Sequence, residues 1–170
     1  PDRVGNEHAN IVPYQVFEVQ DGHLNVAIGN DDQFKKFCAI INRLDLSEKE
    51  KFSTNIMRVA NRSELIPILK QELIKHEKGY LVNEMEKMKV PGGPINKLSE
   101  VFKSNQVSAR GMKIEMENKN SEKGFIELIG NPVKFSKTPV SYRHPPPKSG
   151  EHTNEILNEL SLKRKNNESK

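Results

Sequence analysis

An Asp-Gly pair between two runs of β-forming residues is the feature that most constrains the fold of this chain. Asp21 and Gly22 follow residues 11–19, which are rich in Val, Ile, Tyr and Phe, and precede residues 23–28, where apolar and polar side chains alternate. Asp-Gly readily adopts the backbone angles of a two-residue hairpin turn. We therefore predict a β-hairpin, and the alternation predicts which side chains of its second strand face the core. These are Leu24, Val26 and Ile28.

Helical periodicity dominates the residues after this hairpin. Asn30 or Asp31 can cap a helix whose apolar positions include Phe34 and Cys38. Asn61 begins a second helix, and Glu64 follows it at the spacing of a capping box. We also predict an amphipathic helix over residues 80–88, a last short helix over residues 151–160, and short helical pieces around residues 47–52, 98–102 and 107–110.

Prolines and glycines interrupt the second half of the chain. Residues 90–94 (Val-Pro-Gly-Gly-Pro) predict a loop, because two prolines fix φ and two glycines permit positive φ. Residues 112–116 and 125–129 alternate like the strands of a second hairpin. Residues 137–149 are rich in proline and basic residues, which predicts an extended strap. The residues therefore predict an α+β fold with two hairpins, a helical middle, a strap and a terminal helix.

Composition limits the cellular compartments and the classes of partner that we expect for the protein. No apolar run approaches the ~18 residues of a membrane span, and no signal peptide is apparent. The single cysteine, Cys38, excludes an internal disulfide and fits a reducing compartment, so we expect a soluble cytoplasmic protein without membrane contact. The net charge is only +4, lysines alternate with glutamates, and Trp is absent, which argues against a nucleic-acid partner.

No catalytic pattern stands out from the residues themselves. Cys38 lies on the apolar side of its helix, so we expect a buried core residue and not a nucleophile. The five histidines lack metal-ligand spacing, so we expect no metal. Gly92 and Gly93 lack the pattern of a phosphate-binding loop. From the residues alone, the chain is an α+β region without a visible active site.

Seven short stretches, in order along the chain, resemble the C-terminal half of class III CoA-transferases. This is the family of formyl-CoA transferase, the carnitine and bile-acid CoA-transferases and α-methylacyl-CoA racemase. None of the stretches is diagnostic alone, but the resemblance extends over almost the whole chain, from Arg3 to Leu160. They are residues 5–17, residues 21–23 with 27–34, Phe52-Ser53-Thr54-Asn55 with Arg58-Val59-Ala60-Asn61-Arg62, Val90-Pro91-Gly92-Gly93-Pro94-Ile95-Asn96, residues 106–112, Gly130-Asn131-Pro132-Val133, and residues 150–157.

The resemblance implies a larger architecture than the periodicity can show. Family members are more than twice as long, with a small α+β domain inserted into a Rossmann-like large domain, and two chains interlink like rings as a homodimer. On this mapping residues 1–11 are a linker and residues 12–129 are the small domain. Residues 130–162 are the strap and C-terminal helix that return to the large domain, whose bulk is missing, and residues 163–170 are a disordered tail.

The resemblance also implies a mechanism. In this family an aspartate attacks an acyl-CoA, a mixed anhydride and then an aspartyl-CoA thioester form, and CoA passes to an acceptor carboxylate. Coenzyme A is thus part of the substrate and not a covalently bound cofactor. The expected aspartate lies upstream of Pro1, so no catalytic residue is assigned. Gly5, His8 and Tyr14 are the substrate-proximal candidates, although this sequence lacks the glycine run that some relatives carry here; the alternative is a purely structural linker.

Three functions remain open at this point. The first is CoA transfer between short-chain or dicarboxylic acyl groups, by the full-length protein. The second is an α-methylacyl-CoA racemase, an isomerase on the same fold. The third is a free-standing, non-catalytic binding module. For the first two we expect this C-terminal fragment to be inactive alone, and to aggregate or exchange amide hydrogens quickly beyond Pro139 because the helix around Ile156 exposes its apolar face.

Overall fold

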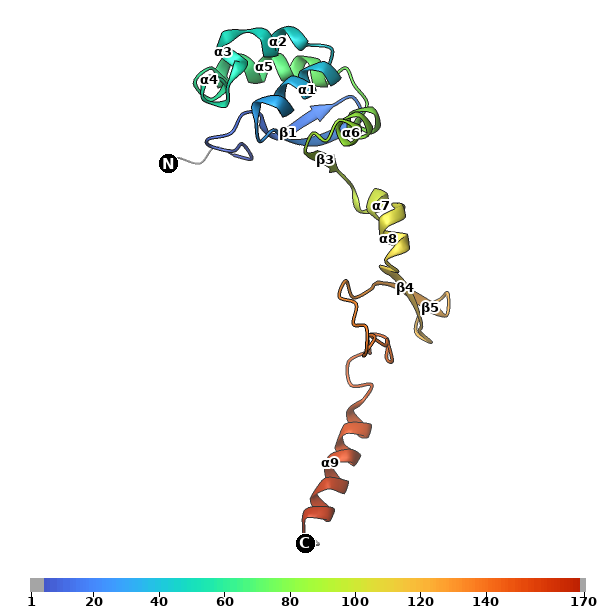
Figure 1. Ribbon diagram of the computed structural model, residues 1–170. Coiled ribbons are helices and arrows are strands. Elements are labelled where there is room, and N and C mark those ends of the chain that lie inside the picture. Colours follow the sequence, from blue (N-terminus) through green and yellow to red (C-terminus); the bar gives the residue numbers. More distant parts are fainter. Residues whose placement is uncertain (1–4, 169–170) are drawn as a thin grey trace. The chain divides into compact units, whose positions relative to one another are not determined.

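The predicted hairpin around Asp21 and Gly22 opens the fold of the computed structural model, which describes residues 5–168, and side chains for residues 5–161 (Figure 1). Strand β1 (Tyr14–Val19) pairs antiparallel with β2 (Gly22–Ala27), and Val19 lies opposite Gly22 at the turn. The side chains of Leu24, Val26 and Ile28 are fully buried, so the predicted core face is confirmed. They are part of one apolar cluster whose buried members lie between Val12 and Val90.

A third strand replaces part of the loop predicted over residues 90–94. Strand β3 (Gly92–Ile95) pairs antiparallel with β2 and completes a sheet of order β1-β2-β3. Neither Gly92 nor Gly93 has a positive φ, so the loop prediction was wrong about their role. A Cβ on Gly92 would stand 2.6 Å from the carbonyl oxygen of Asn25 and would overlap the methyl group of Met85. Glycine is therefore needed at this position of β3, because β2 and the Met85 side chain of α6 both approach it closely.

Within its described residues the first compact unit also holds six helices, whose apolar side chains join the same core as those of the sheet. The predicted cap of the first is confirmed, since Oδ1 of Asn30 accepts from the backbone N–H of Gln33 at 2.9 Å. Helix α5 contacts β1, and α6 contacts β2 and β3; Figure 1 shows α1 to α5 gathered on one side of the hairpin. The helices are α1 (Asp31–Ile40), α2 (Leu44–Glu48), α3 (Glu50–Ser53), α4 (Asn55–Ala60), α5 (Arg62–Leu73) and α6 (Lys78–Lys87).

The capping box predicted at Asn61 is wrong. Helix α4 ends immediately before this residue, and the Asn61 amide donates backward to the carbonyl oxygens of Met57 at 2.9 Å and Lys51 at 3.2 Å. Its side chain makes no capping bond to α5, and Glu64 forms an ion pair with Lys51. Asn61 therefore donates its side-chain amide to carbonyl groups of α3 and α4 and does not use its side chain to cap α5.

Residues from Leu98 onward form the second compact unit. It begins with two short helices, α7 (Leu98–Val101) and α8 (Asn105–Ala109). The predicted second hairpin follows as β4 (Lys113–Glu117) paired with β5 (Phe125–Ile129). The strap, residues 137–149, contains neither helix nor strand, as predicted.

The terminal helix is longer than its apolar pattern indicates. Helix α9 spans Thr153–Glu168 and so continues beyond Leu160 into residues assigned to the tail. Those residues contain no Gly or Pro, and Lys, Arg and Glu favour helix without needing a buried face. Residues 169–170 lie outside the described residues. The domain boundaries at residues 11, 129 and 162 refer to a whole protein and stay a prediction; the chain itself divides after Lys97.

In the second unit, the residues whose side chains the structure describes, 98–161, form no apolar core of their own. Within residues 98–161 the one buried residue is Gly130, which has no side chain. The exposed fractions of apolar side chains there reach 75% for Leu98, 68% for Ile129 and 54% for Phe135. Helix α9 leaves Ile156 and Leu157 more than half exposed. Monomeric proteins seldom leave so many large apolar side chains in water without a partner surface.

Candidate functional site

Residues 5–13, which we name the N-terminal segment, run beside the edge strand β1. The backbone N–H of His8 donates to the carbonyl oxygen of Tyr14 at 2.9 Å, and that of Val16 donates to Oδ1 of Asn6 at 3.1 Å. These bonds occupy polar groups along the open edge of the sheet. The segment therefore folds back on the strand that follows it, and the peptide between Val12 and Pro13 is cis.

Two of the three predicted site residues are in contact. The rings of His8 and Tyr14 stack, with centroids 5.3 Å apart and an interplanar angle of 14°. Both side chains are exposed, Tyr14 to 38%. Gly5 has a φ of +67°, a conformation that favours glycine, and open space where a Cβ would stand. The structure thus brings His8 and Tyr14 together, while Gly5 contributes a backbone turn.

Arg62 holds the middle of the N-terminal segment. Its Nη2 donates to the carbonyl oxygens of His8 at 2.6 Å and Ala9 at 2.8 Å, and its Nη1 pairs with Glu7 at 3.0 Å. The rigid planar fork of a guanidinium suits such simultaneous contacts. Three consecutive residues are thereby fixed to the start of α5.

Asn55 and Arg58, both on α4, hold the end of the segment. The Asn55 amide donates to the carbonyl oxygen of Asn10 at 2.8 Å and accepts from the backbone N–H of Val12 at 3.1 Å. The Arg58 side chain is completely buried. It donates from Nε to the carbonyl oxygen of Val12 at 2.7 Å and from Nη2 to Asp31 at 2.8 Å.

Arg58 is the largest fully buried side chain of the described residues, and its environment explains how it is tolerated. Nη1 donates to the carbonyl oxygen of Phe52 at 3.0 Å, and the guanidinium lies 4.4 Å from the centre of the Phe34 ring. Burial lowers the pKa of Arg58, while the bond to Asp31 opposes that shift. Each of the three guanidinium nitrogens thus donates to a backbone carbonyl or a carboxylate, and the Phe34 ring contacts the face of the group.

Sequence reasoning named Gly5, His8 and Tyr14 but missed Asn55, Arg58 and Arg62. Asn55 and Arg58, three residues apart, share a polar face of α4, which is a signal the sequence does contain, while Arg62 begins the next helix, α5. A polar face, however, normally indicates solvent. Only the tertiary structure shows that this one faces backbone carbonyls.

Cys38 and the described aspartates, the other side chains that could act as nucleophiles, have structural roles. Burial raises the pKa of the Cys38 thiol to about 12, which leaves it protonated and confirms it as a core residue. The described aspartates are also engaged. Asp21 accepts the backbone N–H of Lys78, Asp31 pairs with Arg58, Asp32 pairs with Lys36, and Asp45 pairs with Arg43.

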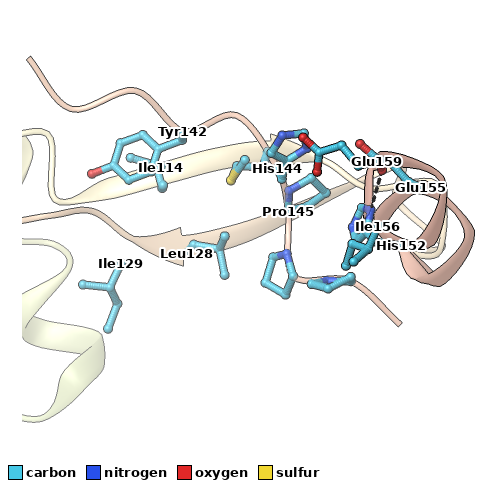
Figure 2. Close-up of a pocket in the computed structure, with 13 residues that line it drawn as sticks. Ile114, Leu128, Ile129, Tyr142, His144, Pro145, His152, Glu155, Ile156 and Glu159 are labelled. Carbon is cyan, nitrogen blue, oxygen red and sulfur yellow. Dashed lines mark hydrogen bonds and ion pairs between the residues drawn. The ribbon is translucent and has the colours of Figure 1, made fainter. Parts of the chain in front are cut away.

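The second unit carries an apolar groove of about 710 Å³ (Figure 2). Ile114 and Leu128 of the hairpin, Tyr142 and Pro145 of the strap, and Ile156 of α9 line it. His152 bonds to Glu155 at 3.3 Å between Nδ1 and Oε2. The groove holds no nucleophile with a neighbouring base, so its apolar walls suit packing better than chemistry.

The residues that the structure describes contain neither a metal site nor a membrane-spanning helix. In the described part of the chain, His, Cys, Asp and Glu side chains form no group of three or more that is arranged to hold a metal ion. Among the helices within residues 5–168, none combines the length and the apolar character needed to cross a bilayer.

Comparison with known proteins relates this chain to one family, by a family model and by individual relatives. Residues 1–153 match the model of the family described as CoA-transferase family III. The chain is 39% identical over 160 residues to a succinate–glutarate CoA-transferase of Agrobacterium fabrum, covering 94% of this chain and 40% of that protein. It is also 39% identical over 158 residues to a human succinyl-CoA:glutarate CoA-transferase, covering 93% of this chain and 36% of that protein.

A solved structure agrees with this relationship. The crystal structure of a CAIB/BAIF family protein from Brucella suis superposes with a TM-score of 0.81 at 38% identity, over 94% of this chain and 40% of that one. The chain therefore spans about 40% of the length of the proteins it resembles.

Proposed function

Because the chain belongs to CoA-transferase family III, we propose that it is part of an enzyme that transfers CoA from succinyl-CoA or a similar acyl-CoA to a dicarboxylic acid such as glutarate. The observation that carries this proposal is the 39% identity, over 94% of the chain, to a transferase with those two acids in its name. The relatives named above are transferases, which favours CoA transfer over racemisation and over a binding module.

The proposed reaction uses an aspartate outside this chain. Its carboxylate attacks the thioester carbonyl, the carbon–sulfur bond breaks, and a mixed anhydride and CoA thiolate form. The thiolate then attacks the aspartyl carbonyl, which releases the donor acid and leaves an aspartyl-CoA thioester. The acceptor carboxylate then attacks this thioester, the same steps run in reverse, and the acceptor leaves as its CoA thioester. Asp21, Asp31, Asp32 and Asp45 are engaged in the fold, which supports placing the nucleophile elsewhere.

The N-terminal segment is the part of this chain that we propose to face the substrate. His8 and Tyr14 form an exposed ring pair on a segment that Asn55, Arg58 and Arg62 hold by backbone contacts. Groups that contact a substrate must be positioned before it binds, and such fixed backbone provides that. Gly5 would supply the turn that leads into the pair.

We propose that a Rossmann-like large domain and a second copy of the protein cover the apolar surface of residues 98–161. Family relatives are more than twice as long as the matched region, and this unit exposes Ile129, Phe135 and Leu157. A strap without regular structure suits a chain that passes around a partner subunit. The free thiol of Cys38 fits a reducing compartment such as the cytoplasm.

The test is an assay of the protein expressed from its complete reading frame. Incubation with succinyl-CoA and glutarate should produce glutaryl-CoA and succinate in equal amounts, measured by mass spectrometry. Isotope from ¹⁸O-labelled glutarate should appear in succinate, because the anhydride steps exchange carboxylate oxygen through the enzyme. Epimerisation of a 2-methylacyl-CoA without any CoA transfer would instead establish the racemase and overturn the proposal.

A further inference from the structure

The tautomer of His8 is fixed by its neighbour. The backbone N–H of Asn10 donates to Nδ1 of His8 at 3.1 Å. A backbone amide can only donate here, so Nδ1 must be the unprotonated, accepting nitrogen, and the neutral ring carries its hydrogen on Nε2. His8 therefore presents an N–H donor in a defined tautomer.

Neither that donor nor the hydroxyl of the stacked Tyr14 has a partner within the described residues. Among the side chains and backbone groups that the structure describes, none bonds to Nε2 of His8 or to the hydroxyl of Tyr14. The rings stack, which restricts rotation of the imidazole, and both side chains are exposed. Two hydrogen-bond donors on stacked rings are thus open to a ligand.

The backbone on both sides of the Nδ1 contact is held by hydrogen bonds to other residues. His8 donates its backbone N–H to Tyr14 and gives its carbonyl oxygen to Arg62, while Asn10 gives its carbonyl oxygen to Asn55. Both residues of the Nδ1 contact are therefore held independently. Such contacts bring no benefit to a surface imidazole without a role. For a hydrogen-bond donor that binds a ligand, they reduce the entropy lost on binding, because the donor is already in place.

We propose that Nε2–H of His8, together with the hydroxyl of the stacked Tyr14, binds the non-reacting carboxylate of the dicarboxylic acid, and so selects dicarboxylic over monocarboxylic acceptors. This rests on the proposed transferase function. Two donors match a carboxylate, which only accepts hydrogen bonds when ionised. The reacting carboxylate needs its lone pairs for attack, so donors of this kind serve better at the other end of the acid.

The experiment compares variants of the full-length protein with glutarate and with pentanoate, which has the same chain length and one carboxylate. His8→Asn keeps an acceptor near Asn10 but removes the donor at the Nε2 position. We expect its kcat/KM for glutarate to fall about 10- to 100-fold, the range for a hydrogen bond to a charged group, with kcat/KM for pentanoate unchanged. His8→Gln, whose amide nitrogen can reach the Nε2 position, should recover most of the loss.

Controls separate this role from a structural one. His23→Asn removes another exposed histidine, outside the ring pair, and should leave both acceptors unaffected. Equal losses for glutarate and pentanoate in His8→Asn, or no loss for either, would overturn the inference while the transferase function stands.

Binding without turnover distinguishes failure of the site from failure of the function. Calorimetric titration of the full-length protein with glutarate should show affinity that His8→Asn reduces and that dimethyl glutarate lacks. If no CoA transfer is found but this binding remains, the proposed function fails and the carboxylate site stands. If glutarate binds equally to the wild type and His8→Asn, the site is disproved.

Discussion

Arg58 donates from Nε to the carbonyl oxygen of Val12 at 2.7 Å, and this bond joins the core of the first unit to the N-terminal segment. The same guanidinium reaches the carbonyl oxygen of Phe52 from a completely buried position. Two buried carbonyl groups therefore depend on one side chain. Any change at Arg58 should affect both the stability of the unit and the conformation of the candidate site.

Arg58→Met should lower the free energy of unfolding by about 2–4 kcal/mol. Methionine has a comparable length but no donor, so the carbonyl oxygens of Val12 and Phe52 lose their bonds, at ~1–3 kcal/mol for each buried group left unsatisfied. Urea unfolding followed by circular dichroism measures the change. Lys36→Ala breaks the exposed pair with Asp32 and should shift the free energy by no more than ~0.5 kcal/mol. Equal losses of unfolding free energy for Arg58→Met and Lys36→Ala would contradict the role of Arg58 in satisfying the buried carbonyl groups.

Gly92→Ala should destabilise the first unit by about 1–3 kcal/mol, the usual cost of overpacking. The added methyl would stand 2.6 Å from the carbonyl oxygen of Asn25 and against the end of Met85, so β3 would have to move away from β2. Gly93→Ala is the matched control, because open space surrounds the position of its Cβ. Thermal unfolding of the two variants should therefore differ clearly, and a similar Tm would show that β3 is not packed this closely.

Lys89→Gly should stabilise the protein by about 0.5–1 kcal/mol. Lys89 has a φ of +56° after α6, where the backbone N–H groups of Lys89 and Val90 bond back to Glu86 and Met85. This left-handed position after a helix favours glycine. Asn42 occupies the equivalent place after α1 with a φ of +55°, and asparagine tolerates it better. Chemical unfolding should thus show a smaller gain for Asn42→Gly, and a loss for Lys89→Gly would disprove the strain.

The elements that local chemistry determines were predictable. Asp21-Gly22 places a turn whatever surrounds it, and burial of Leu24 and Val26 follows from alternation. Two errors have a common cause in tertiary contacts. Gly92 looked like a turn residue because sequence shows a missing side chain but not the strand that approaches it. Asn61 looked like a cap because its competing carbonyl, on Met57, lies in the preceding helix.

The candidate site was predicted in part, and by resemblance more than by residue chemistry. Resemblance pointed to His8 and Tyr14, which the structure finds stacked. The residues that hold their backbone could not be inferred, because a buried arginine such as Arg58 has the same sequence signature as an exposed one. The tautomer of His8 likewise depends on a backbone N–H whose direction is set only by the folded segment.

The Cys38 thiol should make stability depend on pH in the alkaline range. Burial raises its pKa from 9.0 to about 12, so the folded state keeps its proton where the unfolded state has lost it. Stability from this group is complete below pH 9 and declines as the pH rises toward 12. Urea unfolding at pH 8 and pH 10.5 should show a larger loss for the wild type than for Cys38→Ala. Equal losses would mean that the thiol ionises freely in the folded state.

Arg62→Lys should loosen the N-terminal segment without unfolding the unit. Lysine can keep the ion pair with Glu7 but cannot span the carbonyl oxygens of His8 and Ala9 with a planar fork. Losing one such bond costs ~1.4 kcal/mol, which is about a tenfold change in an equilibrium. Amide hydrogen exchange at Asn10 should therefore accelerate about tenfold, because its bond to His8 depends on that backbone.

The same exchange experiment contains its own control. The amide of Leu24, in the centre of the sheet, should exchange at the wild-type rate in Arg62→Lys, because its protection depends on opening of the whole unit. Arg43→Lys alters a guanidinium that pairs with Asp45 and Glu72 and should leave Asn10 unchanged. If Leu24 and Asn10 accelerate together, Arg62 supports the fold as a whole. Selective acceleration at Asn10 instead identifies Arg62 as the residue that positions His8.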